Sequence, residues 1–131
     1  MAQPPIPEDV AKMLQQPNQA VMATVRPDGA PVTVATWYLW DDGRILLNLD
    51  AGRARLDHMR ADPRVSLTVL DGDSWYRHVS IRGTVTMSPD QDLSGVDRLA
   101  IHYTGRPYSN RDRPRVNAWL EVESYHVWGW R

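Results

Sequence analysis

The residues best suited to chemistry stand at 49–55, where the sequence reads Leu-Asp-Ala-Gly-Arg-Ala-Arg. A strand pattern precedes this segment and a helical pattern follows it, so Arg53 and Arg55 fall in the first turn of a helix. Free N–H groups and the helix dipole favour an anion at a helix start, and two guanidinium groups add charged donors. The segment predicts a phosphate site beginning at Gly52, although surface arginines on a solvated helix would give the same pattern.

The sequence contains no group of residues with the spacing of a known catalytic motif. The chain has no cysteine, which excludes disulfides, thiolate catalysis and cysteine-ligated zinc. Its four histidines show no HxH or HxxxH spacing, so we expect no metal site. A nucleophile elbow, a P-loop and paired catalytic carboxylates are also missing from the sequence. We therefore assign no catalytic residue and expect an enzyme that binds and orients its reactants.

Composition indicates one globular domain over residues 1–131, with 42% hydrophobic and 24% charged residues. The net charge of −1 argues against a nucleic-acid partner. The N-terminus does not resemble a signal peptide, and no apolar run approaches the ~20 residues of a membrane helix. We therefore expect a cytoplasmic protein without a membrane partner. Six Trp and five Tyr, with no Phe, favour interfaces or planar ligands in addition to core packing.

Period-two alternation predicts six strands, at residues 20–26, 31–40, 45–49, 64–70, 75–87 and 115–123. Helical spacing predicts three short helices, at residues 7–16, 52–61 and 88–103. The first three strands are separated by strong turns and should form an antiparallel meander. These elements suggest a closed antiparallel barrel with helices covering its ends.

Two details of these elements bear on the site. In the second helix, Leu56 and Met59 should face inward and leave Arg53 and Arg55 exposed. In the fifth strand, Gly83 should mark a bulge or bend.

Seven pieces of the sequence occur in an order and spacing typical of one known superfamily. They are residues 20–34, Trp37, residues 43–48 (Gly-Arg-Ile-Leu-Leu-Asn), 52–55, 60–67 (Arg-Ala-Asp-Pro-Arg-Val-Ser-Leu), 79–85 (Val-Ser-Ile-Arg-Gly-Thr-Val) and 99–105 (Leu-Ala-Ile-His-Tyr-Thr-Gly). In this set the chain resembles the pyridoxamine-phosphate-oxidase-like proteins, and among them the F420-dependent oxidoreductases of actinobacteria. The resemblance covers nearly the whole chain.

The resemblance implies a mainly β fold, a six-stranded antiparallel split β-barrel with short flanking helices that forms a homodimer. It places a cofactor in a groove between the two subunits. The position of Arg55, often Lys in relatives, would hold the cofactor phosphate, with Arg53 assisting. Relatives often have Asn where this chain has His58, and the resemblance implies a cofactor contact from this position as well.

Further cofactor contacts are implied along the second strand and at the chain end. The second strand would follow the edge of the tricyclic ring through Val32, Thr33, Val34, Thr36 and Trp37. Asn48 and Gly52 belong to the matching segments beside the phosphate site. Trp75 occupies a position where relatives place an aromatic near the cofactor, and Arg77 would share its strand face. Other candidates, which would come from the second subunit, are Arg113, Arg115, Tyr125, Trp128 and Trp130.

The activity implied is transfer of a hydride from reduced deazaflavin F420 to an activated double bond of a small organic molecule. Arginines between Thr104 and Arg115 would meet the acidic tail of that cofactor, although plain solvation would explain them too. FMN is the alternative cofactor, in an oxidoreductase related to pyridoxamine-phosphate oxidase. A non-catalytic carrier of F420 or haem is the alternative from a different class.

Overall fold

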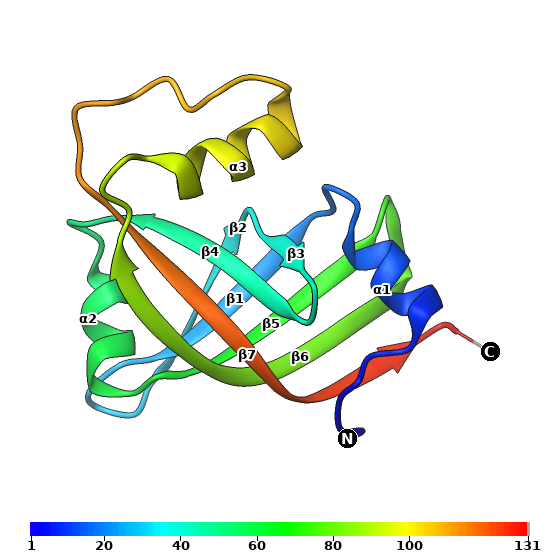
Figure 1. The fold of residues 1–131 in the computed structure, drawn as a ribbon. Coiled ribbons are helices and arrows are strands. Elements are labelled where there is room, and N and C mark those ends of the chain that lie inside the picture. The colour runs from blue at the N-terminus through cyan, green and yellow to red at the C-terminus, as the bar shows by residue number, and fades with distance from the viewer. Residues whose placement is uncertain (131) are drawn as a thin grey trace.

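Seven strands form one antiparallel sheet in the computed structural model, which describes residues 1–130 (Figure 1). The strands are β1 (Ala20–Val25), β2 (Pro31–Thr36), β3 (Leu39–Asp41), β4 (Arg44–Asp50), β5 (Arg64–Asp71), β6 (Ser74–Pro89) and β7 (Arg115–Trp128). Their order across the sheet is β2-β1-β5-β6-β7-β4-β3. The helices are α1 (Glu8–Leu14), α2 (Ala54–Ala61) and α3 (Ser94–Thr104). None of these helices is long and apolar enough to cross a membrane.

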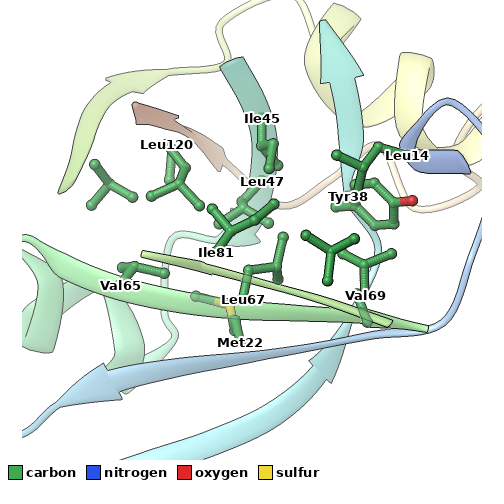
Figure 2. Packing of buried hydrophobic residues seen from close by; sticks show 14 of the residues in the cluster. Leu14, Met22, Tyr38, Ile45, Leu47, Val65, Leu67, Val69, Ile81 and Leu120 are labelled. Carbon is green, nitrogen blue, oxygen red and sulfur yellow. The ribbon is translucent and has the colours of Figure 1, made fainter. Parts of the chain in front are cut away.

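The sheet curls around one apolar core, to which β1, β4, β5, β6 and β7 contribute buried side chains (Figure 2). Val65, Leu67 and Val69 alternate along β5 and are buried, as the period-two pattern predicts. Leu14 of α1 is fully buried in the same cluster. Burying side chains of this size stabilises the fold by about 1.5–3 kcal/mol each, so this core stabilises the curled sheet.

The predicted strand at residues 31–40 is broken, and the sheet has seven strands where six were predicted. Tyr38, between β2 and β3, turns into the core, is fully buried and donates its hydroxyl to the Gln16 carbonyl at 3.0 Å. The chain therefore crosses from one edge of the sheet to the other. The predicted three-stranded meander is wrong for the same reason, because β1–β2 and β3–β4 form separate hairpins.

The predicted closed barrel is also wrong, because β2 and β3 are both edge strands. The short strand β3 pairs only with residues 44–46 of β4. From Leu47 to Asp50, β4 pairs with β7 alone. The barrel is consequently split beside this half of β4, and the split contains the candidate site.

The long strands β6 and β7 bend where the sequence predicts. Their register shifts between Arg82 and Gly83, which confirms the predicted bulge. A Cβ atom at Gly83 would overlap the carbonyl oxygen of Glu121, so this close approach of two backbones requires glycine.

The predicted helix at residues 88–103 begins later than expected. Strand β6 continues to Pro89, which pairs with Val116 of β7. Helix α3 starts at Ser94, because the buried Asp90 side chain accepts hydrogen bonds from the N–H groups of Gly95 and Val96 at 3.0 and 2.9 Å. Figure 1 shows α3 lying across the open end of the barrel.

Candidate cofactor site

A cavity of about 660 Å³ opens at the split of the barrel, between β2, β4 and α3. Its size is within the usual range for small-molecule sites. Five of the predicted cofactor residues line it, namely Thr36, Trp37, Asn48, Arg53 and Arg115. Residues 1–130 bring no three His, Asp or Glu side chains together as a metal-binding cluster.

The turn before α2 is fixed by one carboxylate. The Oδ1 atom of Asp50 accepts the Gly52 N–H at 2.8 Å. Arg113 donates to both Asp50 oxygens, from Nε at 2.7 Å and from Nη2 at 2.9 Å. The Arg113 guanidinium, followed by the Gly52 N–H, holds the pKa of this carboxyl far below its usual range. Arg113 was predicted to contact the cofactor, but its charge is paired with Asp50, and it orders the turn that carries Arg53.

Two arginines follow this turn without a carboxylate partner among residues 1–130 (Arg53 and Arg55). Arg53 stands at the N-terminus of α2, which has no side-chain cap. Arg55 was predicted to be exposed but is half-buried, and its Nε atom is buried without a hydrogen-bond partner. Burial, and secondarily the charge of Arg53, lowers the pKa of Arg55. A buried cation next to a like charge is costly, so this pair is suited to bind an anion.

His58, on the same helix, is directed toward the barrel wall. Its Nδ1 atom lies 3.2 Å from the hydroxyl oxygen of Thr24, which is fully buried. One ring nitrogen therefore has a partner within the chain, and the predicted contact of His58 with a cofactor stays a prediction.

Along the edge strand β2, backbone groups are more available to a ligand than side chains are. Val32, Val34 and Thr36 pair with inward-facing residues of β1, and Thr33 is exposed on the outer face. Because β2 has a partner on one side only, alternate residues direct their N–H and C=O groups away from the sheet. The predicted role of this strand therefore depends on its main chain.

Aromatic side chains form one wall of the cavity. The rings of Trp37 and Tyr103 are stacked, with centroids 5.3 Å apart and an angle of 11° between their planes. Tyr108 meets Trp37 edge-on at 6.5 Å. The Tyr103 hydroxyl donates to the Asn18 carbonyl at 2.7 Å, and burial raises the pKa of Tyr103 to about 12. This hydroxyl is therefore a structural donor at neutral pH.

Tyr103 and Tyr108 were not predicted as site residues. They come from α3 and the loop after it, a region where only arginines were considered. The unusual number of Trp and Tyr residues was the available signal in the sequence, but it carries no information about which of them share a cavity.

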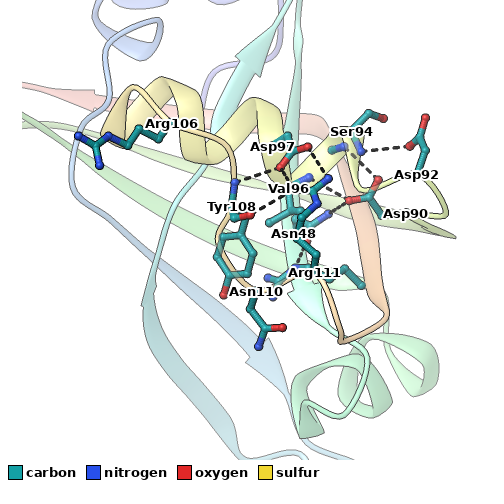
Figure 3. A network of polar contacts seen from close by, with 12 residues as sticks. Asn48, Asp90, Asp92, Ser94, Val96, Asp97, Arg106, Tyr108, Asn110 and Arg111 are labelled. Atoms are coloured by element: carbon teal, nitrogen blue, oxygen red, sulfur yellow. Dashed lines mark hydrogen bonds and ion pairs between the residues drawn. The ribbon is translucent and has the colours of Figure 1, made fainter.

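A polar network joins Asn48 to Asp90 at the start of α3 (Figure 3), and Arg115 is bonded to Asn48. Asn48 donates from Nδ2 to Asp90 at 3.0 Å and to Asn117 at 2.7 Å. Its Oδ1 atom accepts the Nε–H of Arg115 at 2.7 Å. The Arg115 guanidinium lies over the ring of Tyr108, 4.6 Å from its centroid. These contacts fix the Arg115 side chain at the cavity wall.

Trp75 and Arg77 lie outside this cavity, on the strand that follows the β5–β6 turn. The Trp75 side chain is 85% exposed. Arg77 forms an ion pair with Asp71 at 3.0 Å and lies over Trp130, 4.2 Å from the ring centroid. Within one chain, neither residue lines the cavity that Arg53 lines.

The fold and sequence match proteins of one family. A family model described as pyridoxamine 5'-phosphate oxidase matches residues 6–129. An F420 reductase is 29% identical with a TM-score of 0.84, over 92% of this chain and 98% of that one. The conserved hypothetical protein Rv2991 from Mycobacterium tuberculosis is 26% identical with a TM-score of 0.78, over 98% and 88% of the two chains.

A third structure shares the fold at lower identity. A putative pyridoxamine 5'-phosphate oxidase from Listeria innocua is 16% identical with a TM-score of 0.73, over 92% of this chain and 95% of that one. The split barrel with its flanking helices agrees with the predicted fold class. Since the family model spans nearly the whole chain, this protein belongs to the pyridoxamine 5'-phosphate oxidase family.

Proposed function

We propose that this protein is an F420-dependent reductase that transfers a hydride to an activated double bond of a small organic molecule. The observation that carries the proposal is the pair Arg53 and Arg55 at the start of α2, two cations without a carboxylate partner among residues 1–130, of which Arg53 lines the cavity. The family supports a flavin-like cofactor, and the similarity to an F420 reductase supports the deazaflavin.

The residues at the turn fit the phosphate of such a cofactor. The buried, unpaired Nε atom of Arg55 needs an acceptor. Phosphate oxygens accept charged hydrogen bonds from arginine with good geometry. The uncapped start of α2 adds a favourable dipole. Gly52 is not a donor in this proposal, because its N–H is bonded to Asp50.

The rest of the cavity fits a planar ring. Reduced F420, when bound, supplies the hydride. The chain contributes the free edge of β2, the half-buried indole of Trp37 and the apolar side chains of Val96 and Leu99, which limit access of water. Tyr103 is not the proton donor, since burial raises its pKa to about 12 and its hydroxyl is bonded to Asn18. We expect the proton to come from solvent.

The proposal includes a homodimer in which the second subunit completes the cleft. The outer face of β1 and β2 presents mainly apolar side chains, and Val21 is 42% exposed there. Trp75 is more exposed still and lies away from the cavity of its own chain. A second copy would cover such surfaces and bring the aromatic side chain to a cleft. A cytoplasmic location likewise remains a prediction.

The test is a titration of the purified protein with F420 and with FMN, followed by tryptophan fluorescence. We expect quenching by F420 at micromolar concentration. Arg55→Ala should weaken binding at least tenfold, because a charged contact to phosphate contributes about 1.5–3 kcal/mol. Arg60→Ala is the matched control, since Arg60 lies on the same helix, is exposed and pairs with Asp57 at 3.2 Å. Equal affinity of wild type and Arg55→Ala would remove the phosphate assignment.

Two further results would redirect the proposal. Tighter binding of FMN than of F420 would favour an FMN-dependent oxidoreductase, the alternative that the family name supports. Tight binding of F420 without turnover of any quinone or enone would favour a carrier protein.

A further inference from the structure

We infer that the electron acceptor is a planar conjugated molecule bearing a carboxylate, and that Arg115 binds this carboxylate. The inference rests on the proposed function, because it names the substrate class of the same cavity. It is carried by the position, contacts and neighbours of the Arg115 guanidinium.

Arg115 is held in place while most of its donors stay available. Its Nε–H donates to Asn48, and its guanidinium lies over the Tyr108 ring. Its two terminal nitrogens form no hydrogen bond or ion pair within the part of the chain that the structure describes. A guanidinium can accept a carboxylate through two parallel N–H donors, and in Arg115 these donors remain free on a side chain that is already oriented.

Neighbouring arginines of the same region differ in this respect. Arg111 donates to both oxygens of Asp97, at 2.9 and 3.1 Å. Arg113 donates to both oxygens of Asp50. Each therefore already has the bidentate carboxylate partner that Arg115 lacks. Because Arg115 is half-buried and lines the cavity, an acidic group of a ligand is the partner that would compensate its charge.

The surroundings of Arg115 define the rest of the ligand. Tyr108 contacts Arg115 through its ring face and Trp37 edge-on. Trp37 is stacked on Tyr103, so three aromatic rings continue from the guanidinium along the cavity wall. Aromatic walls of this kind bind flat conjugated rings. A ligand with a planar conjugated body and a carboxylate at one end matches both features.

Carboxylates could reach Arg115 from the acidic tail of the cofactor as well as from the acceptor. We assign the acceptor as the source, because the tail extends from the cofactor phosphate, which the proposed function places at Arg53 and Arg55, whereas Arg115 adjoins the aromatic wall where the planar rings would lie. The experiment therefore has one arm for each source.

The first arm measures binding of an enone pair to the cofactor-free protein by isothermal titration calorimetry. The probes are 4-(3-oxobut-1-enyl)benzoate and its carboxamide, which differ only in charge at one end. We expect the carboxylate to bind at least tenfold more tightly to the wild type. Arg115→Gln should abolish this preference and leave the carboxamide Kd unchanged within twofold, whereas Arg115→Lys should retain part of it.

The matched control is Arg44→Gln. Arg44 also lies over an aromatic ring, 4.1 Å from the centroid of Trp119, but outside the cavity, and its variant should keep the full preference. Absence of a preference in the wild type, or its persistence in Arg115→Gln, would overturn the inference. These results are independent of turnover, so they are distinguishable from a failure of F420 to bind.

The second arm compares F420 carrying several glutamates with its tail-free form, by the fluorescence titration described above. We expect Arg115→Gln to change the two Kd values by the same factor. A loss of tenfold or more that is confined to the tailed form would show that Arg115 binds the cofactor tail, and the assignment to the acceptor would then be abandoned.

Discussion

At the scale of single residues, the arginines that line the cavity or lie on the neighbouring α2 and the segment before β7 fall into two groups according to their partners. Arg111 and Arg113 bind carboxylates of their own chain with both oxygens engaged. Arg53, Arg55 and Arg115 have no such carboxylate within residues 1–130. Since paired arginines are electrostatically satisfied, the second group is where we place the ligand contacts.

Tyr103 supports a prediction on pH and stability. Burial raises its pKa from 10.0 to about 12, so above pH 10 the unfolded chain loses this proton while the folded chain keeps it. The contribution of Tyr103 to stability is therefore complete below pH 10 and is lost as the pH rises toward 12. One such group changes the free energy of unfolding by at most about 1.4 kcal/mol per pH unit.

Urea unfolding of the wild type and of Tyr103→Phe between pH 9 and 12 tests this. We expect the free energy of unfolding to decline less steeply in Tyr103→Phe, with some decline remaining because burial also raises the pKa of Tyr38. Tyr76→Phe, at an exposed position, is the control. Identical slopes for Tyr103→Phe and the wild type would contradict the prediction.

A local pattern in the sequence predicts some residues of the candidate site and misses others, for a physical reason. Gly52, Arg53 and Arg55 are close together in the chain, so a local pattern is enough to select them as candidates, and Arg53 lines the cavity. Tyr103 and Tyr108 reach the cavity only because α3 lies against the split, which is a long-range property of the fold. The pairing of Arg113 with Asp50 joins residues far apart in sequence, and no local pattern distinguishes Arg113 from Arg115.

At the scale of elements, alternation predicts strands well but not their breaks. Val65, Leu67 and Val69 alternate within β5 and appear as predicted. Residues 31–40 alternate equally well, yet the burial of Tyr38 divides them between the two sheet edges. The late start of α3 was also not predicted, because the carboxylate that caps the helix lies four residues before the first helical residue. Ser88-Pro89 resembles a helix start and therefore misled the prediction.

The cap of α3 supports a prediction on stability. Asp90 is buried and accepts bonds from two helix N–H groups and from Asn48. Asp90→Ala removes the cap and leaves these donors without a partner, so we expect the free energy of unfolding to fall by about 2–4 kcal/mol. Urea denaturation measures the change.

Asp92→Ala is the matched control for this cap. Asp92 precedes the same helix but is exposed and accepts one bond, from the Ser94 N–H at 3.1 Å. We expect a much smaller loss of stability in Asp92→Ala. Equal losses in the two variants would show that the buried cap has no special role.

At the scale of the whole molecule, the split of the barrel and the exposed sheet face are linked. Because alternate residues of β1 face the core, Val21, Ala23 and Val25 lie on its outer side. They are next to Ala35 and Thr33 of β2. The same strand β2 borders both this face and the cavity. A second subunit seated on the outer face would therefore lie close to the cavity, which connects the proposed dimer with the proposed cofactor cleft.

This connection gives a prediction on assembly. Val21→Glu places a charge on the outer face without entering the core, since the Val21 side chain is 42% exposed. We expect the wild type to have the mass of a dimer in light scattering and the variant to dissociate at least tenfold more readily, a change of about 1.4 kcal/mol. Binding of F420 should weaken in parallel, because the cleft loses the wall that the second subunit supplies.

Ile101→Glu is the control, since Ile101 is 50% exposed on α3, away from this face, and a charge there should change neither mass nor affinity. A wild-type protein with the mass of a single chain that binds F420 normally would refute the shared cleft and leave the phosphate turn as a site complete within one subunit.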